Sequence, residues 1–196
     1  MHMDERLDRR AAIASGLALG VGLLSGSTGN ASAGVDAQGK INPDEGVTAP
    51  EDLMKEHGVL NRCLLIYEEG MRRLRDGEEV TPNMFHHTAD LVRRFVEEYH
   101  EKNEENYIFP VFEKRNTLVD LVHTLKIQHK AGRTVTNRIL DLSTPDKFKS
   151  PGSREEIRTL CESFIRMYRP HESREDTVLF PALRTLLTPK TGISPW

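Results

Sequence analysis

A short motif that combines histidine with carboxylates occurs twice in the 196-residue chain. Two segments share the pattern H-E-x-x-E-[ED]-x-x-[IL]-F-P, namely residues 100–110, HEKNEENYIFP, and residues 171–181, HESREDTVLFP. Because residues four positions apart lie on one face of a helix, His100 and Glu104 would point the same way. The same holds for His171 and Glu175. An imidazole one turn from a carboxylate, supplied twice, is what a metal site inside a helix bundle requires.

The elements that must position these residues are amphipathic helices. Apolar residues recur at steps of three and four in four segments, which are residues 50–76, 81–110, 117–142 and 153–187. A capping box at Ser153 marks the start of the fourth segment. We expect Pro110 to bend or break the second helix, and Pro170 to kink or bulge the fourth. No segment alternates like a strand, so the predicted fold is all-α: an up-down-up-down four-helix bundle over residues 50–188, followed by a C-terminal tail, 189–196.

Each predicted helix carries one histidine where its apolar face would need a core residue. These histidines are His57, His100, His129 and His171. A single histidine on such a face is usually a hydrogen-bonded core residue, but four of them, two with a carboxylate one turn on, favour a metal. Burying Glu104 and Glu175 as bare charges would cost on the order of several kcal/mol each, and a cation would compensate.

The order of these residues indicates two related hairpins. A helix with a lone histidine is followed by a helix with a His/Glu pair, and this arrangement occurs twice. The residues before His57 and His129 also run in parallel, LMKEH and LKIQH. We therefore expect two helical hairpins related by a pseudo-twofold axis that meet at a two-metal centre.

With these ligands in this order, the chain resembles the hemerythrin-like (HHE cation-binding) family over about residues 51–187. The resemblance implies a four-helix bundle with a non-haem di-iron site. It also implies the role of each residue: His57, His100, His129 and His171 would be terminal iron ligands, and Glu104 and Glu175 would bridge the two irons.

Two departures from the family's oxygen carriers affect the expected site. The carriers have a second histidine one turn from the third-helix ligand, where this chain has Arg133 or, on the other side, Leu125. The chain thus looks closer to the group that includes iron-centre repair proteins. The carriers also place the fourth-helix carboxylate five positions after its histidine, which makes Asp176 the alternative to Glu175. Imidazole and carboxylate ligands leave zinc or manganese open as the metal.

The expected function is that of a redox-active di-iron protein that binds dioxygen, nitric oxide or peroxide and reduces, scavenges or senses it, with an unidentified electron donor. The first alternative is an iron store or buffer without turnover. The second is a bundle whose site is empty or filled with zinc and whose role is interaction with a partner. A net charge of −3 and the lack of a basic run argue against nucleic acid as that partner.

The N-terminal residues predict export. Residues 1–33 combine Arg9-Arg10, a short apolar run and a small-residue site ending at Ala33, which together resemble a twin-arginine signal peptide. The apolar run is too short to span a bilayer comfortably, so stable membrane insertion is not expected. Residues 34–49 read as a flexible linker. The mature protein would then be periplasmic or otherwise exported.

The remaining candidates receive plainer interpretations. Glu101 and Glu172 are expected on a solvated face, with a role near the metals as the second option. Cys63 and Cys161 lie off the apolar faces, and no disulfide is expected. The other residues are expected as surface or rim histidines and as core tyrosines: His86, His87, His123, Tyr99 and Tyr107.

Overall fold

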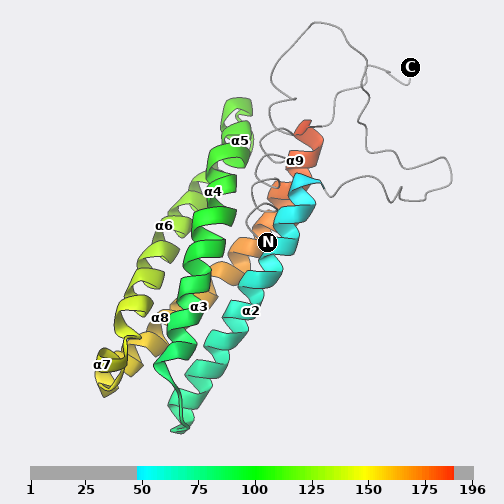
Figure 1. Cartoon of the computed structure of the whole chain (residues 1–196). Coiled ribbons are helices and arrows are strands. Elements are labelled where there is room, and N and C mark those ends of the chain that lie inside the picture. Colours follow the sequence, from blue (N-terminus) through cyan, green and yellow to red (C-terminus); the bar gives the residue numbers. More distant parts are fainter. Residues whose placement is uncertain (1–47, 188–196) are drawn as a thin grey trace, which may run out of the picture. The chain divides into compact units, whose positions relative to one another are not determined.

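The computed structural model describes residues 48–187, which form helices and no strand (Figure 1). The predicted all-α bundle is confirmed. The predicted signal peptide, the C-terminal tail and all but the last two residues of the linker lie outside the described residues. The elements are α2 (Ala49–Asp76), α3 (Pro82–Leu91), η1 (Val92–His100), α4 (Glu101–Asn103), η2 (Glu104–Ile108), α5 (Phe109–Arg115), α6 (Val119–Leu142), α7 (Pro145–Phe148), α8 (Pro151–Arg174), η3 (Glu175–Leu179) and α9 (Phe180–Leu187), where η denotes π-helix.

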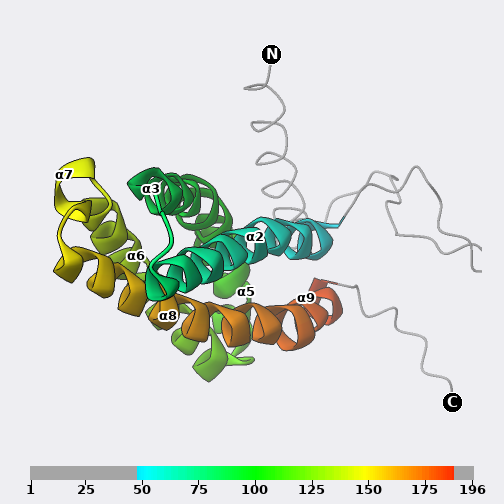
Figure 2. The ribbon, with the colours of Figure 1, turned by 90° about the horizontal axis from the view of Figure 1, so that it is seen from below.

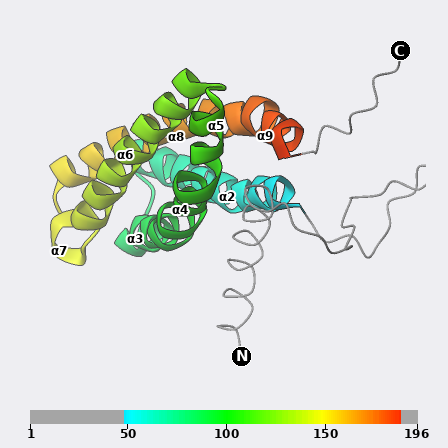
Figure 3. The same ribbon diagram turned by 90° about the horizontal axis from the view of Figure 1, so that it is seen from above.

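These elements join into longer rods that pack side by side. The segments from α3 to α5 follow one another without a break, and so do those from α8 to α9. α6 lies against both α3 and α8, and α7 lies at the opposite end of α6 from α5 (Figure 1). Views along the bundle show α2 between α8 and α3 (Figures 2 and 3). The compact unit begins at Leu53. We call residues 53–115 the first half of the bundle and residues 119–187 the second half.

Helix starts differ slightly from the sequence-based expectation. α6 begins at Val119, two residues later than predicted, because Asn116 and Leu118 adopt left-handed backbone conformations with φ of 50°. α8 begins at Pro151 after Ser150, so the predicted capping box at Ser153 lies inside the helix. Proline at a first helical position is favoured because its missing N–H would have no partner there.

Buried polar side chains interrupt the apolar core along every rod. On α2, for example, His57 lies between the buried Leu53 and Leu60. Full burial of a leucine or phenylalanine stabilises the fold by about 1.5–3 kcal/mol, so the apolar residues on both sides can hold a polar layer in place. Among residues 48–187, no helix is both long enough and apolar enough to span a lipid bilayer.

Two π-helical turns occur at matching places in the repeated motif. η2 begins at Glu104 and η3 begins at Glu175, and each ends just before a Phe-Pro pair. A proline inside a helix cannot donate its hydrogen bond and clashes with the carbonyl four residues earlier, and a wider turn relieves this conflict. The predicted break at Pro110 does not occur, since α5 continues beyond it to Arg115, and the irregularity there is the π-helical turn directly before the Phe-Pro pair.

The expected bulge at Pro170 is also corrected. α8 continues through Pro170 as an α-helix and ends at Arg174. The irregularity of the fourth rod lies further on, at η3, where it precedes Pro181. The bulge thus follows the repeated Phe-Pro pair and not the proline beside His171.

Candidate metal centre

The six predicted ligands come together in the interior of the bundle. None of them is more than 4% exposed. They come from all four rods: His57 from α2, His100 from the end of η1, Glu104 from the start of η2, His129 from α6, His171 from α8 and Glu175 from the start of η3. Residues far apart in the sequence thus form one buried polar layer.

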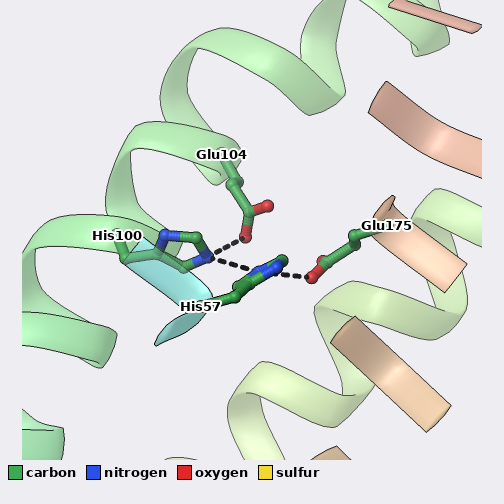
Figure 4. Close-up of side chains that lie close together, drawn as sticks. All are labelled: His57, His100, Glu104 and Glu175. Atoms are coloured by element: carbon green, nitrogen blue, oxygen red, sulfur yellow. Dashed lines mark hydrogen bonds and ion pairs between the residues drawn. The ribbon is translucent and has the colours of Figure 1, made fainter. Parts of the chain in front are cut away.

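The first pair of histidines lies between the two carboxylates (Figure 4). The Nε2 atoms of His57 and His100 are 3.1 Å apart. Glu104 Oε2 lies 3.7 Å from His100 Nε2, and Glu175 Oε2 lies 3.3 Å from His57 Nε2. Ligand atoms of these four residues all lie within 4.8 Å of one another, which is close enough to hold one ion.

The second pair repeats this arrangement with the same two carboxylates. The Nε2 atoms of His129 and His171 are 3.3 Å apart. Glu104 Oε2 lies 3.5 Å from His129 Nε2, and Glu175 Oε1 lies 3.1 Å from His171 Nε2. Each carboxylate therefore faces both histidine pairs. In particular, Glu175 turns one oxygen to each pair, as a carboxylate that bridges two ions would.

The electrostatics of the layer call for cations. All four carboxylate oxygens of Glu104 and Glu175 are buried and accept no hydrogen bond, a state that costs several kcal/mol unless a charge compensates. Burial and the nearby charge of Glu175 raise the pKa of Glu104 well above its usual range. Imidazole nitrogen and carboxylate oxygen are ligands for iron, zinc and manganese. The residues present thus fit a pair of such ions.

The four histidines also share an outer hydrogen-bond pattern. The Nδ1 atom of each ring faces a side-chain oxygen on a neighbouring helix: Asp176 at 2.9 Å from His57, Glu56 at 2.9 Å from His100, Glu105 at 3.2 Å from His129 and Gln128 at 3.0 Å from His171. An acceptor opposite Nδ1 favours the tautomer that carries its proton there. The Nε2 lone pairs are then left pointing into the centre.

These contacts bear on the choice between Glu175 and Asp176. Glu175 is fully buried with its oxygens toward the Nε2 atoms, whereas Asp176 is 38% exposed and lies on the outer side of His57. Burial alone would lower the pKa of His57, but Asp176 and Glu175 raise it to about 10. The geometry supports Glu175 in the inner layer.

Sequence reasoning predicted none of the four as an outer partner: Asp176 was considered only as an alternative ligand to Glu175, and Glu56, Glu105 and Gln128 were missed. The signal was present in the repeat itself. Glu56 and Gln128 immediately precede the lone histidines in the parallel segments LMKEH and LKIQH, and Glu105 matches Asp176 at the acidic [ED] position of the motif. A residue that recurs beside a ligand in both halves is therefore a candidate outer partner.

The solvated-face interpretation of Glu101 and Glu172 is wrong, because they are only 1% and 5% exposed. Glu101 accepts hydrogen bonds from the Tyr168 hydroxyl at 2.6 Å and from Arg133 at 2.7 Å. Glu172 accepts one from Asn61 at 3.0 Å, and burial raises its pKa to about 7. Both carboxylates thus tie helices together beside the centre.

A third group of possible ligands already has a cation. Ligand atoms of Glu101, Glu105 and His129 lie within 4.8 Å of one another. The guanidinium of Arg133 donates to Glu101 at 2.7 Å and to Glu105 at 2.6 Å. Its charge satisfies the two carboxylates, so this group does not add a third metal position.

The minor expectations have mixed outcomes. Tyr107 is 38% exposed and is not a core residue. Cys63 and Cys161 were expected off the apolar faces, but both are fully buried free thiols, and burial raises the pKa of Cys63 to about 11. The remaining residues lie at the surface or are half-buried: His87 and His123 are exposed, and His86 and Tyr99 are half-buried.

Comparison with known proteins places the chain in a family. Residues 48–183 match the family described as Hemerythrin HHE cation binding domain. The chain therefore belongs to the hemerythrin HHE cation-binding family, and the buried His/Glu layer fits the metal binding that this family name denotes.

Relatives occur in mycobacteria. Two proteins from strains of Mycobacterium tuberculosis and one from Mycobacterium bovis, each described as an uncharacterized protein, are 45% identical over 142 residues. The match covers 72% of this chain and 56% of each relative, so the chain spans about half the length of the curated relatives it matches. No solved structure matches.

Proposed function

We propose that the protein binds two iron ions in the buried layer and uses them to bind and reduce or scavenge a small oxidant, namely dioxygen, nitric oxide or peroxide. One observation carries the proposal: two buried carboxylates without hydrogen bonds each face both histidine pairs. We take the four rods in the predicted up-down-up-down order. Each hairpin then supplies a lone histidine and a His/Glu pair.

In this proposal, the terminal ligands of the first ion are His57 and His100, and those of the second are His129 and His171. Glu104 and Glu175 would bridge the ions. A bound iron pair supplies one-electron redox chemistry and coordination positions for a small molecule. The four Nε2 atoms and the four carboxylate oxygens of these side chains would fill fewer positions than two six-coordinate ions have, so both ions would keep an open position.

The surrounding side chains favour reaction over reversible oxygen carriage. One turn after His129, where an oxygen carrier has a further histidine, Arg133 is engaged by Glu101 and Glu105 and supplies no ligand. An ion pair held by these residues, with both ions open, would supply adjacent binding positions for small molecules. This arrangement favours coupling and reduction, with an electron donor that remains to be identified.

The protein also protects the centre from water. Phe180 stacks on the ring of His57 at 5.8 Å between centroids, and Phe109 stacks on His129 at 5.5 Å. Both phenylalanines are fully buried. They keep bulk water from the histidines and fix the orientation of the rings that hold the ions.

Metal analysis and anaerobic kinetics test the proposal. Protein purified after iron-replete expression should contain two irons per chain. The reduced protein should be oxidised when mixed with nitric oxide, dioxygen or peroxide in stopped-flow spectroscopy. An oxygen adduct that releases its oxygen under vacuum would contradict reduction, and slow iron uptake without oxidation would support the store or buffer.

We further propose that the protein is exported as a mature chain beginning at Gly34. The support is the sequence alone: Arg9-Arg10, the apolar run and the Ala31-Ser32-Ala33 site. N-terminal sequencing of the native protein would test this, and an intact Met1 in the cytoplasmic fraction would contradict it. Replacing Arg9 and Arg10 with lysine should block export if the route is twin-arginine.

A further inference from the structure

We infer that the two metal positions are unequal, and that the position between His57 and His100 binds a divalent cation more tightly and fills first. We call it the first position, and the one between His129 and His171 the second position. This inference rests on the proposed two-ion centre and deepens it. The inner ligands are matched in kind and number, so the difference must come from the side chains around them.

The first difference is the acceptor behind the paired histidines. His100 faces the carboxylate of Glu56, whereas His171 faces the neutral amide of Gln128. These acceptors occupy the same place in the two halves, directly before the lone histidine. A carboxylate polarises the Nδ1–H bond more strongly than an amide does, and it makes the imidazole a better donor to a metal. The first position therefore has the stronger ligand.

The second difference concerns the carboxylates behind the lone histidines. Asp176 Oδ1 lies 2.9 Å from His57 Nδ1. Glu105 lies farther from His129 Nδ1, at 3.2 Å, and also accepts from Arg133 at 2.6 Å and from Lys102 at 2.5 Å. Because two cations share its charge, Glu105 polarises its histidine less. The first position has the stronger acceptor here too.

The third difference is a nearby positive charge. Arg133, beside the second position, corresponds to Asn61 beside the first position, because each lies four residues after a lone histidine and donates to the glutamate that follows a paired one. The Arg133 side chain is only 27% exposed, so water screens its charge incompletely. Its charge offsets the negative charge of Glu101 and Glu105, which would otherwise favour a cation nearby, whereas Asn61 carries no charge.

All three differences act in the same direction. Changing one outer partner of a metal-bound histidine typically alters metal affinity about 10–100-fold. We therefore expect the first position to bind Co²⁺, a convenient probe, on the order of 10–100 times more tightly than the second. At one equivalent of metal, most chains should hold a single ion between His57 and His100.

Competition titrations of metal-free protein with Co²⁺ and a chelator can measure both constants. His129→Ala removes a ligand of the second position and should leave one tight site. His57→Ala should leave one weaker site. Gln128→Glu should raise the association constant of the second position for Co²⁺ about 10-fold. Glu56→Gln should lower the association constant of the first position by a similar factor. Glu98→Gln, which alters an exposed carboxylate on the same rod as His100, should change neither constant.

The outcomes separate this inference from the function it rests on. The inequality would be overturned if His57→Ala and His129→Ala bound Co²⁺ with equal affinity. It would also be overturned if Gln128→Glu kept the wild-type Co²⁺ affinities. Both outcomes would leave the two-ion centre intact. Failure of wild-type protein to bind more than one Co²⁺ even at saturation would contradict the two-ion centre itself. Circular dichroism of each variant establishes that a lost site does not reflect a lost fold.

Discussion

The two halves of the bundle are nearly alike at the histidines and differ one layer outward. The rings of His57 and His100 lie 4.8 Å apart between centroids at an angle of 58°, and those of His129 and His171 lie 5.0 Å apart at 59°. Each lone histidine is also stacked by the phenylalanine of the opposite half's motif, Phe180 on His57 and Phe109 on His129. The proposed coordination of two ions would require this symmetry at the histidines, and it places no such requirement on the side chains around them.

The asymmetry is clearest three residues beyond the lone histidines. The first half has Leu60 there, and the second half has Gly132. A Cβ atom added at Gly132 would lie 2.1 Å from the Tyr168 hydroxyl. The glycine thus makes room for a tyrosine that donates to Glu101. The second half replaces an aliphatic contact with a hydrogen-bonded tyrosine beside the centre.

The largest expected effect tests whether both halves depend on the same bridging carboxylates. Glu104→Ala and Glu175→Ala each remove a carboxylate that faces both histidine pairs, and each should lower bound iron from two ions per chain toward none. Glu101→Ala should retain two, because both oxygens of Glu101 are already engaged, one by Tyr168 and the other by Arg133. Elemental analysis of purified variants measures this. Equal iron loss in Glu101→Ala would show that the inner layer is wrongly assigned.

A second prediction concerns alanine substitutions at Leu60 and Gly132, the matched positions whose side chains differ in size. Leu60→Ala should destabilise the protein by about 2–5 kcal/mol through a cavity. Gly132→Ala should cost about 1–3 kcal/mol through overpacking against Tyr168. Denaturant unfolding gives both values.

The control for overpacking is a double-mutant cycle with a smaller neighbour. Tyr168→Leu frees the space that a Cβ at position 132 would enter, so Gly132→Ala should cost less in that background. An unchanged cost would mean that the clash with Tyr168 is not what requires the glycine.

A third prediction distinguishes the two bridging carboxylates in metal-free protein. Glu104 Oε2 lies 3.5–3.7 Å from its nearest imidazole nitrogens, whereas the Glu175 oxygens have contacts of 3.1 and 3.3 Å. Without metal, Glu104 is therefore the less compensated of the two. Glu104→Gln should stabilise metal-free protein by about 1–2 kcal/mol, more than Glu175→Gln does.

Thermal unfolding with and without a chelator measures this effect. In metal-loaded protein the sign should reverse, because glutamine cannot supply a bridging carboxylate. The same sign in both states would contradict the view that metal compensates the buried charge.

The same comparison explains what a single sequence could predict. The burial of the six histidines and glutamates in the inner layer was predictable because each one interrupts an apolar period, as His57 does between Leu53 and Leu60, and such an interruption is visible in the chain alone. Glu56 and Glu101 were not, because a glutamate beside a buried position is equally compatible with a solvated face. Only packing against the neighbouring rod decides between the two.

Backbone irregularity was harder to place than the fold. The four helices could be predicted from the periodicity of their apolar residues. The effect of Pro110, however, depends on whether a wider helical turn can accommodate the hydrogen bond that proline cannot donate. The π-helical turn at η2 does so and keeps Glu104 pointing inward. Propensity alone predicts a break, because it omits the packing that holds the helix together on both sides of the proline.

The smallest expected effect compares two buried tyrosines, one in each half. Tyr168 donates its hydroxyl to Glu101 at 2.6 Å, whereas the buried hydroxyl of Tyr67 has no hydrogen-bond partner among the described residues. A hydrogen bond to a charged group contributes about 1.5–3 kcal/mol, but Glu101 keeps Arg133 as a partner, so Tyr168→Phe should cost only about 1–2 kcal/mol.

Tyr67→Phe should instead be neutral or stabilise the protein by up to about 1 kcal/mol, since it removes an unsatisfied polar group at nearly constant volume. Both rings are fully buried and contact Phe164, Tyr67 edge-on and Tyr168 in a tilted arrangement, so lost packing cannot explain opposite signs. Denaturant unfolding of the two variants side by side measures the difference, and equal effects would mean that the Tyr168–Glu101 hydrogen bond does not stabilise the second half.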